Sequence, residues 1–333
     1  MNIGIKGYYG FGNFGDELFL ETFKQIFNDQ TVFPIIPPLS KQECDRIIIG
    51  GGDIILPYSF NSSYFPSDIQ SIKKWVYGVG IVDYYPKETW PDIEVKKYRD
   101  AINQSEGIYL RDANSKKIAD ELKLHYKTIV QVPDIAFSYK QPKFPVQKNK
   151  LEKVVGFCPF AYNSFPIEKM SNILAEISKK NNYRIALISV VDTRNPYSDL
   201  STCLQLKELI MTKNPKARIT VVEYKYLDVT YSFIQSLDYL ISFKLHPSIV
   251  GIRNLVPTFC FSSLSKVTSL LKAFDLEDFY CNYNEPEEMM KQKIDYFFAS
   301  AEKKMVTVKS KVVAMEKKSD ECLRKLRMEV TKK

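Results

Sequence analysis

The sequence predicts an α/β protein with two Rossmann-like domains that face each other across a cleft. Short apolar segments alternate with amphipathic ones along the chain, as in proteins whose parallel strands are joined by helices. Residues 141–150 are polar, basic and contain proline, which is typical of a linker, and the alternation then begins again. We therefore expect one domain at 1–140, a linker at 141–152, a second domain at 153–300 and a basic amphipathic helix at 301–333.

In the first half, uninterrupted apolar runs such as Ile47-Ile48-Ile49 predict strands that are buried on both faces. The expected strands are 3–6, 47–49, 75–82, 108–110 and 130–132, and the expected helices are 18–27, 96–103 and 115–122. In the second half we expect strands at 153–158, 184–191, 218–222, 237–243 and 256–261, and helices at 166–180, 204–211, 228–235, 248–253, 266–274 and 285–299.

A glycine-rich loop follows the first expected strand, and its spacing Gly10-x-Gly12-x-x-Gly15 matches a dinucleotide-binding fingerprint. We reject that interpretation, because residues 32–37 end without the acidic residue that would hold a ribose. Asp16 and the neighbouring glutamate would also repel a pyrophosphate at the start of the helix. The glycines instead allow a close backbone approach, with Asn13 and Asp16 offering hydrogen bonds to hydroxyl groups. The alternative is a tight turn before an acidic helix start.

Two further strand ends carry polar or glycine residues. Gly50, Gly51 and Gly52 follow the strand at 47–49, and they form either a ligand loop or a flexible turn. Arg111 follows the strand at 108–110, where it can clamp a carboxylate or phosphate with two hydrogen bonds. The alternative for Arg111 is a structural contact with Asp112.

The segment Ser242 to Ser248 joins an expected strand to an expected helix that begins after Pro247. Ligands of open α/β sheets bind beyond the carboxyl ends of strands, and a helix N-terminus attracts anions. Lys244 adds a positive charge there, and His246 can transfer a proton near neutral pH. The alternative is that His246 only caps the helix and that Lys244 is solvated.

Composition excludes several classes of protein. Six scattered cysteines without a C-x-x-C pair argue against a disulfide scaffold or zinc site, and two histidines exclude a histidine-rich metal site. A carboxylate-only Mg²⁺ site stays open. His125 is interpreted as a surface or structural residue. No signal peptide, membrane-spanning run or nucleic-acid motif is visible, so we expect a cytoplasmic protein.

The net charge is +8, and much of the excess lies after residue 303 in the expected C-terminal helix. This helix either packs back on the body of the protein or rests on an anionic membrane surface or polyanion. Contact with a membrane would place the protein at its inner face.

The motifs together resemble the polysaccharide pyruvyl transferase family over nearly the whole chain. The resemblance is carried in order by Gly7-Tyr8-Tyr9-Gly10-Phe11-Gly12-Asn13-Phe14-Gly15-Asp16-Glu17, Ile49-Gly50-Gly51-Gly52, Leu110-Arg111-Asp112 with Ser115, Asp134-Ile135-Ala136-Phe137, Lys244-Leu245-His246, Gly251, Pro257 and Ser265-Lys266-Val267. It implies a fold like the two-domain glycosyltransferases called GT-B. It also implies transfer of a carboxyvinyl unit from phosphoenolpyruvate to two hydroxyls of one sugar, which forms a pyruvate ketal.

This resemblance suggests roles for the candidate residues. His246 would be the general acid. Donor binding would involve Lys244, Leu245, Arg111, Ser248 and Lys266, and acceptor binding Gly12, Asn13, Asp16, Gly51 and Gly52. We expect no metal and no cofactor beyond phosphoenolpyruvate as co-substrate. The acceptor would be a saccharide of a cell-surface polysaccharide or its precursor, in free or lipid-linked form.

One residue departs from the family pattern. The family usually has arginine where this chain has Lys244, and lysine keeps the charge but lacks the bidentate fork. Two other functions therefore stay open. One is a GT-B-type glycosyltransferase that uses a nucleotide sugar, and the other is a non-catalytic glycan-binding relative.

Overall fold

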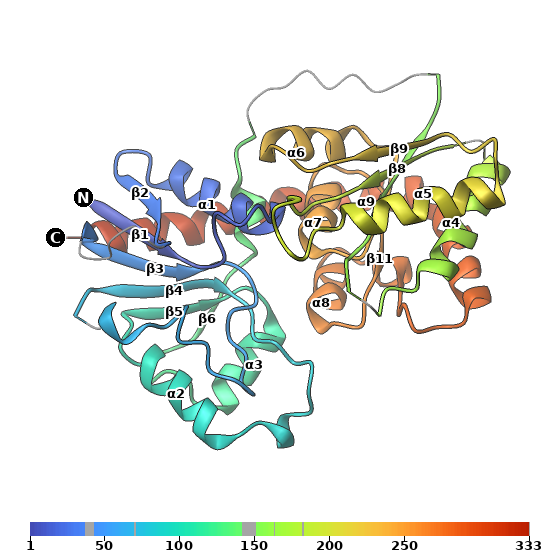
Figure 1. Ribbon diagram of the computed structural model, residues 1–333. Coiled ribbons are helices and arrows are strands. Elements are labelled where there is room, and N and C mark those ends of the chain that lie inside the picture. The colour runs from blue at the N-terminus through green and yellow to red at the C-terminus, as the bar shows by residue number, and fades with distance from the viewer. Residues whose placement is uncertain (37–42, 70, 142–150, 163, 182, 333) are drawn as a thin grey trace.

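The protein contains two six-stranded sheets in which every pair of neighbouring strands is parallel (Figure 1). The computed structural model describes residues 1–36, 43–69, 71–141, 151–162, 164–181 and 183–332. The expected α/β class with two Rossmann-like halves is confirmed. The proposed linker lies mostly outside the described residues, so the domain boundaries stay predictions.

The first sheet has the strand order β2-β1-β3-β4-β5-β6. Its strands are β1 (Asn2–Lys6), β2 (Thr31–Pro34), β3 (Arg46–Gly50), β4 (Lys74–Val79), β5 (Gly107–Leu110) and β6 (Val130–Gln131), and its helices are α1 (Phe14–Ile26), α2 (Asp92–Ile102) and α3 (Ala113–Glu121). Ile47 and Ile49 of β3 join the apolar core on one face, while Ile48 joins the core on the other. Both faces are covered, which explains the continuous apolar run.

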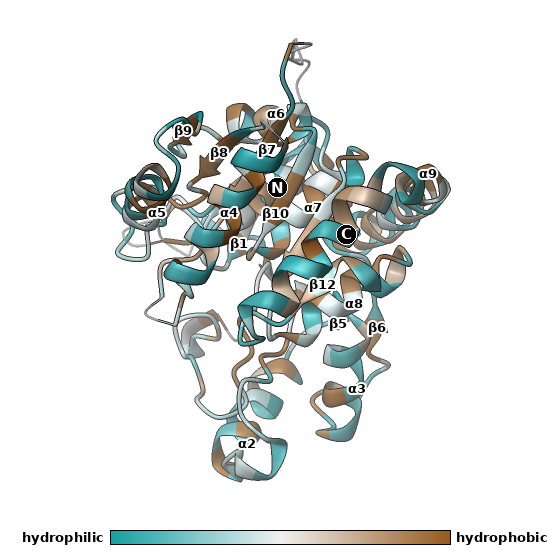
Figure 2. Ribbon diagram, turned by 90° about the vertical axis from the view of Figure 1, so that its right-hand side faces the viewer, coloured by the Kyte–Doolittle hydropathy of each residue, from teal (hydrophilic) through white to brown (hydrophobic). Residues whose placement is uncertain are grey.

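The second sheet has the order β12-β11-β10-β7-β8-β9. Its strands are β7 (Val154–Cys158), β8 (Arg184–Ile188), β9 (Ile219–Val222), β10 (Tyr239–Ser242), β11 (Thr258–Phe261) and β12 (Tyr280–Cys281), and the helices of this half are α4 (Ile167–Asn181), α5 (Leu200–Lys213), α6 (Leu227–Ser236), α7 (Leu245–Arg253), α8 (Ser265–Ala273) and α9 (Glu287–Thr331). Figure 2 shows the apolar strands β7, β8 and β10 inside and the polar surface of α5 outside.

Several expectations about elements were wrong or incomplete. The strand expected at 184–191 ends at Ile188, and the helices expected at 285–299 and 301–333 form one helix. The helix after Ser242 begins at Leu245 and places Pro247 in its third position, where the missing N–H has no partner within a helix either. The strand expected at 75–82 ends at Val79, because its pairing shifts register next to Gly78, which has a φ of +70°. The edge strand β12 was not predicted, since it is only two residues long.

Helix α9 is one continuous segment of 45 residues that packs on both halves of the protein. Its first part, including Phe297 and Val308, belongs to the core of the second half. Its last turns contribute Leu323, Leu326 and Val330 to a core that also contains the residues of β1. The exposed face is mainly polar but also carries Val306, Val313 and Met328, and Figure 2 shows hydrophilic and hydrophobic residues alternating along α9. Of the two alternatives given for the C-terminal helix, the structure shows that it packs back on the body of the protein, including the first half.

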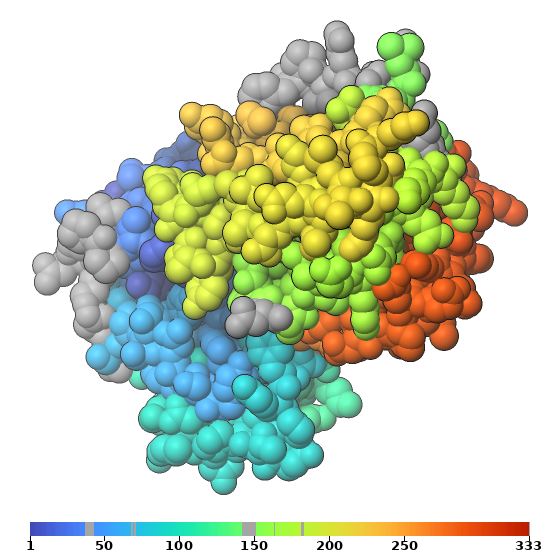
Figure 3. All heavy atoms as spheres, turned by 45° about the vertical axis from the view of Figure 1, so that its right-hand side comes forward, coloured from blue at the N-terminus to red at the C-terminus, as the bar shows by residue number. Residues whose placement is uncertain are grey.

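The glycine-rich loop before α1 bridges the two halves. The Phe14 N–H donates to the Val190 carbonyl at 3.0 Å, and the Asp192 N–H donates to the Gly12 carbonyl at 2.7 Å. Asn13 and Val191 form an isolated antiparallel bridge. In Figure 3 the blue atoms of the N-terminal region lie against the yellow-green atoms of the second half. These contacts hold the carboxyl ends of the two sheets toward each other.

Candidate active site between the two sheets

A cavity of about 660 Å³ lies between the two halves, beyond the carboxyl ends of β1, β3, β5 and β10. Both halves contribute to its wall. The polar and glycine residues that line it include Tyr8, Asn13, Asp16, Gly52, Asp53, Arg111, Lys244, His246 and Lys266. Eight of the eleven residues predicted from the sequence line this cavity, namely Asn13, Asp16, Gly52, Arg111, Lys244, Leu245, His246 and Lys266.

His246 lies in the first turn of α7, and its imidazole fits between the two halves. Its ring centroid is 5.3 Å from that of Phe19 in an edge-to-face contact. A Cβ atom on Gly15 would lie 1.9 Å from the imidazole Nδ1, so only glycine leaves room for the ring. On the other side, Nε2 lies 3.8 Å from an Asp134 carboxylate oxygen. Among the described residues, neither of these two buried atoms has a hydrogen-bond partner.

The imidazole of His246 is neutral in the free protein. Burial lowers its pKa to about 3, and the positive charges of Arg111 and Lys266 act in the same direction. The nearby Asp53 carboxylate opposes this effect but is too weak to reverse it. An anion placed between the two cations would therefore favour the protonated imidazole.

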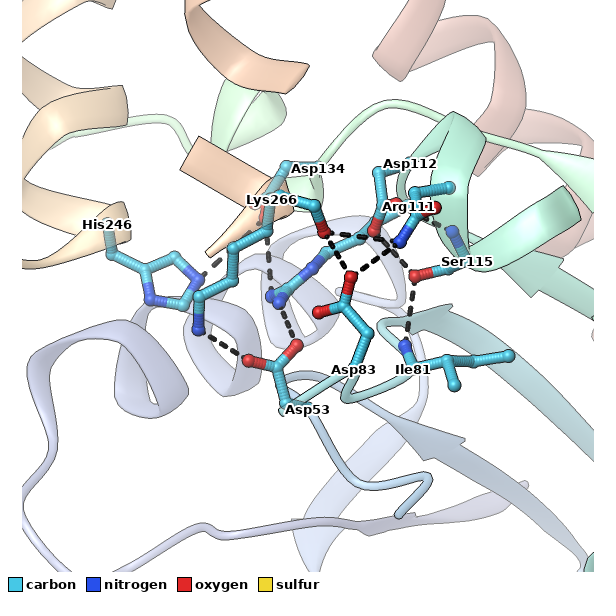
Figure 4. Close-up of polar contacts among 11 residues, drawn as sticks. Asp53, Ile81, Asp83, Arg111, Asp112, Ser115, Asp134, His246 and Lys266 are labelled. Carbon is cyan, nitrogen blue, oxygen red and sulfur yellow. Dashed lines mark hydrogen bonds and ion pairs between the residues drawn. The ribbon is translucent and has the colours of Figure 1, made fainter. Parts of the chain in front are cut away.

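Arg111 and Lys266 are held together by one carboxylate, as Figure 4 shows. Arg111 follows β5 in the first half, Lys266 lies in the first turn of α8 in the second half, and both donate to the Asp53 side chain. Burial acts against ionisation of Asp53, but the two cations outweigh it and lower the pKa of this carboxyl below its ordinary range. Arg111 also lies 3.8 Å from Asp134. Asp53 is therefore the shared anionic partner of both cations.

Lys244 faces the cavity from the N-cap of α7, yet its ammonium is not free. It lies 2.9 Å from Oδ1 of Asp199, a carboxylate that is fully buried. Burial raises the pKa of Asp199, while the charge of Lys244 opposes that rise. The pair fixes the lysine at the cavity wall. The expectation that Lys244 binds an anionic donor stays a prediction.

Asp16 lies in the first turn of α1 and is 8% exposed. Burial raises its pKa to about 8, and the negative charge of Glu17 adds to the effect. The Glu17 carboxylate itself accepts the backbone N–H groups of Gly10 at 2.8 Å and Gly12 at 3.3 Å. Asp16 is therefore protonated over most of the neutral range and can donate a hydrogen bond into the cavity.

Three predicted residues do not line this cavity. Gly12, at a φ of +68°, packs against Asp192 of the second half, where a Cβ atom would lie 2.3 Å from the Asp192 Cβ. Gly51 packs against Tyr9 and Phe19 below the surface. Ser248 is buried, and its hydroxyl donates to the Lys244 carbonyl at 2.8 Å. These residues shape the loops rather than the cavity wall.

Sequence reasoning missed several residues of the site. Asp53 directly follows the triple glycine, and Asp134 opens the Asp134-Ile135-Ala136-Phe137 segment, which carries part of the family resemblance, so both positions carried a signal. The aromatic wall carried none, because its members Tyr8, Tyr64, Tyr84, Phe160, Tyr162 and Tyr283 are scattered along the chain. His125 is buried, with Nε2 lying 3.2 Å from the Ser105 carbonyl oxygen, so its structural interpretation agrees with the contact.

The described residues contain no group of three or more histidine, cysteine or acidic side chains that could hold a metal ion. None of the helices in the described ranges has a stretch apolar enough and long enough to cross a membrane.

Solved structures with a similar fold include MnaA of S. aureus in complex with UDP, with 9% identity and a TM-score of 0.62 over 93% of this chain and 90% of that chain. The UDP-GlcNAc 2-epimerase of Neisseria meningitidis bound to UDP-GlcNAc has 11% identity and a TM-score of 0.60 over 98% and 99% of the two chains. A glycosyltransferase of Rickettsia africae has 14% identity and a TM-score of 0.58 over 99% and 98%. These similarities establish a GT-B-like fold.

A comparison with curated proteins found no match. The family model for polysaccharide pyruvyl transferase, in contrast, matches residues 13–265, which contain the end of the glycine-rich loop, Arg111, the Lys244-Leu245-His246 segment and the first residue of α8. The matched segment covers most of the chain and the central part of the cavity wall. The chain therefore belongs to the polysaccharide pyruvyl transferase family.

Proposed function

We propose that this protein transfers a carboxyvinyl unit from phosphoenolpyruvate to a sugar of a cell-surface polysaccharide or its precursor, forming a pyruvate ketal. The observation that carries the proposal is the convergence of Arg111, Lys266 and His246 from both halves on one cavity. Two cations and a buried imidazole match a substrate with a carboxylate, a phosphate and a vinyl group that must be protonated.

Donor binding requires an exchange of anions at Arg111 and Lys266. Phosphoenolpyruvate would replace the Asp53 carboxylate as the partner of these two side chains. The guanidinium suits a bidentate contact with the substrate carboxylate or phosphate, while the ammonium acts as a point charge. Lys244 would add a third positive charge, reduced by its pairing with Asp199. Leu245 supplies an apolar contact to the same wall.

The bound donor would also prepare His246 for its role. Raising its pKa from about 3 to about 7 takes roughly 5 kcal/mol of additional attraction between imidazolium and substrate. One unit charge about 4 Å away contributes about 4 kcal/mol at an effective dielectric constant of about 20. The several negative charges of phosphoenolpyruvate are therefore sufficient.

The proposed reaction balances with these groups. The His246 imidazolium gives its proton to the vinyl CH₂, which becomes a methyl group and leaves the adjacent carbon electrophilic. A sugar hydroxyl attacks this carbon and loses its proton to the imidazole. The carbon–oxygen bond to phosphate then breaks, and the phosphate leaves. The second hydroxyl attacks the same carbon and closes the ketal, and its proton leaves with the phosphate. No metal or further cofactor takes part in these steps.

The acceptor hydroxyls would meet the loops of the first half. Asn13, Asp16 and Gly52 line the cavity there. A protonated Asp16 can donate to one hydroxyl oxygen, and the Asn13 side chain is fixed by accepting the Gly15 N–H at 3.0 Å. Gly12 and Gly51 would contribute indirectly, because they permit the loop conformations.

The outer face of α9 supports peripheral contact with an anionic membrane. Its exposed cations have no ion-pair partner among the described residues, and exposed Val306, Val313 and Met328 lie on the same face. These cations are Lys303, Lys309, Lys317, Lys318, Arg324 and Lys325. Their arrangement is typical of helices that lie on a membrane surface. We therefore propose a cytoplasmic protein at the inner face of a membrane.

Thermal unfolding with separate ligands tests the donor. A ligand at a hundred times its Kd stabilises a protein by about 2.7 kcal/mol. We expect phosphoenolpyruvate to raise the unfolding midpoint, and the Arg111→Gln and Lys266→Gln variants to lose this shift. A shift with UDP-GlcNAc alone would instead favour the nucleotide-sugar glycosyltransferase. Saccharide binding without phosphate release from phosphoenolpyruvate would favour a non-catalytic relative.

A further inference from the structure

A second, smaller cavity of about 200 Å³ opens beside the main one. We call it the tyrosine annex. Three tyrosines line it, and these are Tyr8, Tyr162 and Tyr197. The other residues of its wall are Asn13, Ala161, Val191, Asn195 and Lys244. Tyr8, Asn13, Tyr162 and Lys244 also line the main cavity, so the two spaces share a wall.

The aromatic rings of the annex are unusually open to solvent. Tyr162 is 60% exposed and Tyr197 is 56% exposed, with 6.1 Å between their ring centroids. Phe11 stacks on Tyr8 with ring centroids 4.7 Å apart and is 50% exposed. Exposed aromatic surface that is gathered at one place is characteristic of a binding site. Each tyrosine also offers a hydroxyl beside its apolar face.

The annex is held in shape by one buried amide. Asn195 is 5% exposed, and its Nδ2 donates to the Tyr8 hydroxyl at 3.0 Å and to the Phe11 carbonyl at 2.9 Å. Its Oδ1 accepts the Tyr197 N–H at 2.9 Å. One side chain of the second half therefore fixes aromatic residues from both halves. A site organised in this way loses little conformational entropy when a ligand binds.

We infer that the annex binds a neutral sugar unit of the acceptor glycan, next to the unit that receives the ketal. The inference rests on the proposed function. Sugar rings present an apolar C–H face, which packs on an aromatic ring, and hydroxyls at the edge, which bond to groups such as the Asn13 amide and the tyrosine hydroxyls. The space has room for about one sugar ring. The shared wall at Lys244 and Asn13 places that ring next to the reacting sugar.

This assignment names the substrate class as an oligosaccharide rather than a free monosaccharide. A monosaccharide would occupy only the main cavity and leave the aromatic rings uncovered. A nucleobase would also stack on tyrosine, but the annex wall carries amide and hydroxyl groups suited to a polyhydroxylated ring. Nucleoside binding is therefore the competing outcome of the test.

The test uses the full chain with a panel of neutral hexose mono-, di- and trisaccharides on a glycan array, in the presence of phosphoenolpyruvate. The variants are Tyr162→Ala, Tyr197→Ala and their double variant, and Tyr226→Ala is the matched control. Tyr226 is 70% exposed and lines neither cavity. Removal of exposed rings leaves the core intact, which the unfolding midpoint checks.

We expect the wild-type protein to retain disaccharides about 3- to 10-fold better than the corresponding monosaccharide. The double variant should lose this difference, and Tyr226→Ala should keep it. Equal retention of both lengths, no retention of any glycan, or a wild-type difference that survives in the double variant would overturn the assignment. Displacement of the glycan by UMP would also overturn it and identify a nucleoside site.

Calorimetry with phosphoenolpyruvate separates this inference from the proposed function. Its Kd should stay within about twofold in Tyr197→Ala, because Tyr197 lines the annex but not the main cavity that contains Arg111 and Lys266. Normal phosphoenolpyruvate binding without a length effect would reject only the annex. A length effect without phosphoenolpyruvate binding would reject the pyruvyl transfer and leave a glycan-binding annex.

Discussion

Replacement of Asp53 by asparagine should strengthen the binding of phosphoenolpyruvate. In the free protein the Asp53 carboxylate accepts hydrogen bonds from both Arg111 and Lys266, the two cations proposed to hold the donor. The donor must displace this internal anion and then remain close to it. The Asp53→Asn variant keeps the shape of the side chain but removes its negative charge.

The size of the effect follows from the separation of the charges. A carboxylate displaced to about 5 Å from one substrate charge repels it by about 3 kcal/mol at an effective dielectric constant of 20, and by about 1 kcal/mol in bulk water. Since about 1.4 kcal/mol corresponds to a tenfold change, we expect the Kd to fall by about 5- to 100-fold. Inorganic phosphate should show a gain in the same direction.

Isothermal titration calorimetry measures this Kd without an acceptor sugar. Asp83→Asn is the control, because Asp83 lies in the same region but bonds to the neutral side chains of Asn114 and Ser265. Its effect should stay below threefold. The unliganded Asp53→Asn protein should also unfold more readily, since Arg111 is left with Asp134 as its remaining carboxylate partner at 3.8 Å. Unchanged or weaker binding by a folded Asp53→Asn protein would refute the displacement argument.

Four other predictions test the site and the surface. His246→Ala should abolish phosphate release from phosphoenolpyruvate while the circular dichroism spectrum stays unchanged, and near-normal release would remove His246 from the mechanism. Gly15→Ala should push the His246 imidazole away by more than 1 Å and lower turnover at least about 100-fold, although alanine itself favours the helix. Normal turnover in this variant would show that Gly15 does not confine the imidazole ring. The Asp16 pKa of about 8 lies above its unfolded value, so the folded state binds the extra proton, and this carboxyl lowers stability as pH rises from about 4 to 8. Urea unfolding should therefore show a smaller loss of stability between pH 5 and pH 8 in Asp16→Asn than in the wild type, and an equal loss would place the Asp16 pKa in the normal range. Finally, vesicles that contain one third phosphatidylglycerol should sediment the protein, whereas pure phosphatidylcholine vesicles should not. Binding to the phosphatidylglycerol vesicles should fall at least tenfold when Lys303, Lys309, Lys317 and Lys325 are all replaced by glutamine.

The residues that the sequence located correctly share one property. Arg111, Lys244 and His246 each follow an apolar strand within a few positions, and parallel strands direct such residues to one edge of the sheet. The local sequence pattern is therefore sufficient to place these residues at the carboxyl edge of a sheet. Because the carboxyl edges of the two sheets face each other, the same pattern also predicted the position of the cavity.

Other features of the site depend on residues far apart in the sequence. Asp53 is 58 residues from Arg111 and 213 residues from Lys266, so no local pattern reveals that it neutralises both. Gly15 belongs to a literal dinucleotide fingerprint, yet its structural reason is the imidazole of His246 packed against it. The depressed pKa of that imidazole also arises only from the assembled cavity. Sequence reasoning placed His246 at the cavity but could not give its charge state.

The continuous helix α9 limits how the two halves can move. At about 1.5 Å per residue, its 45 residues form a rod about 67 Å long. Its buried side chains pack in the cores of both halves. The Ser319 hydroxyl of α9 also accepts a hydrogen bond from the Ser138 hydroxyl at 2.7 Å. A hinge motion that separated the two halves would have to bend this helix or remove Leu323, Leu326 and Val330 from the core of the first half. Opening of the cavity by movement of the two halves must therefore either deform α9 or break its packing in one of the two cores.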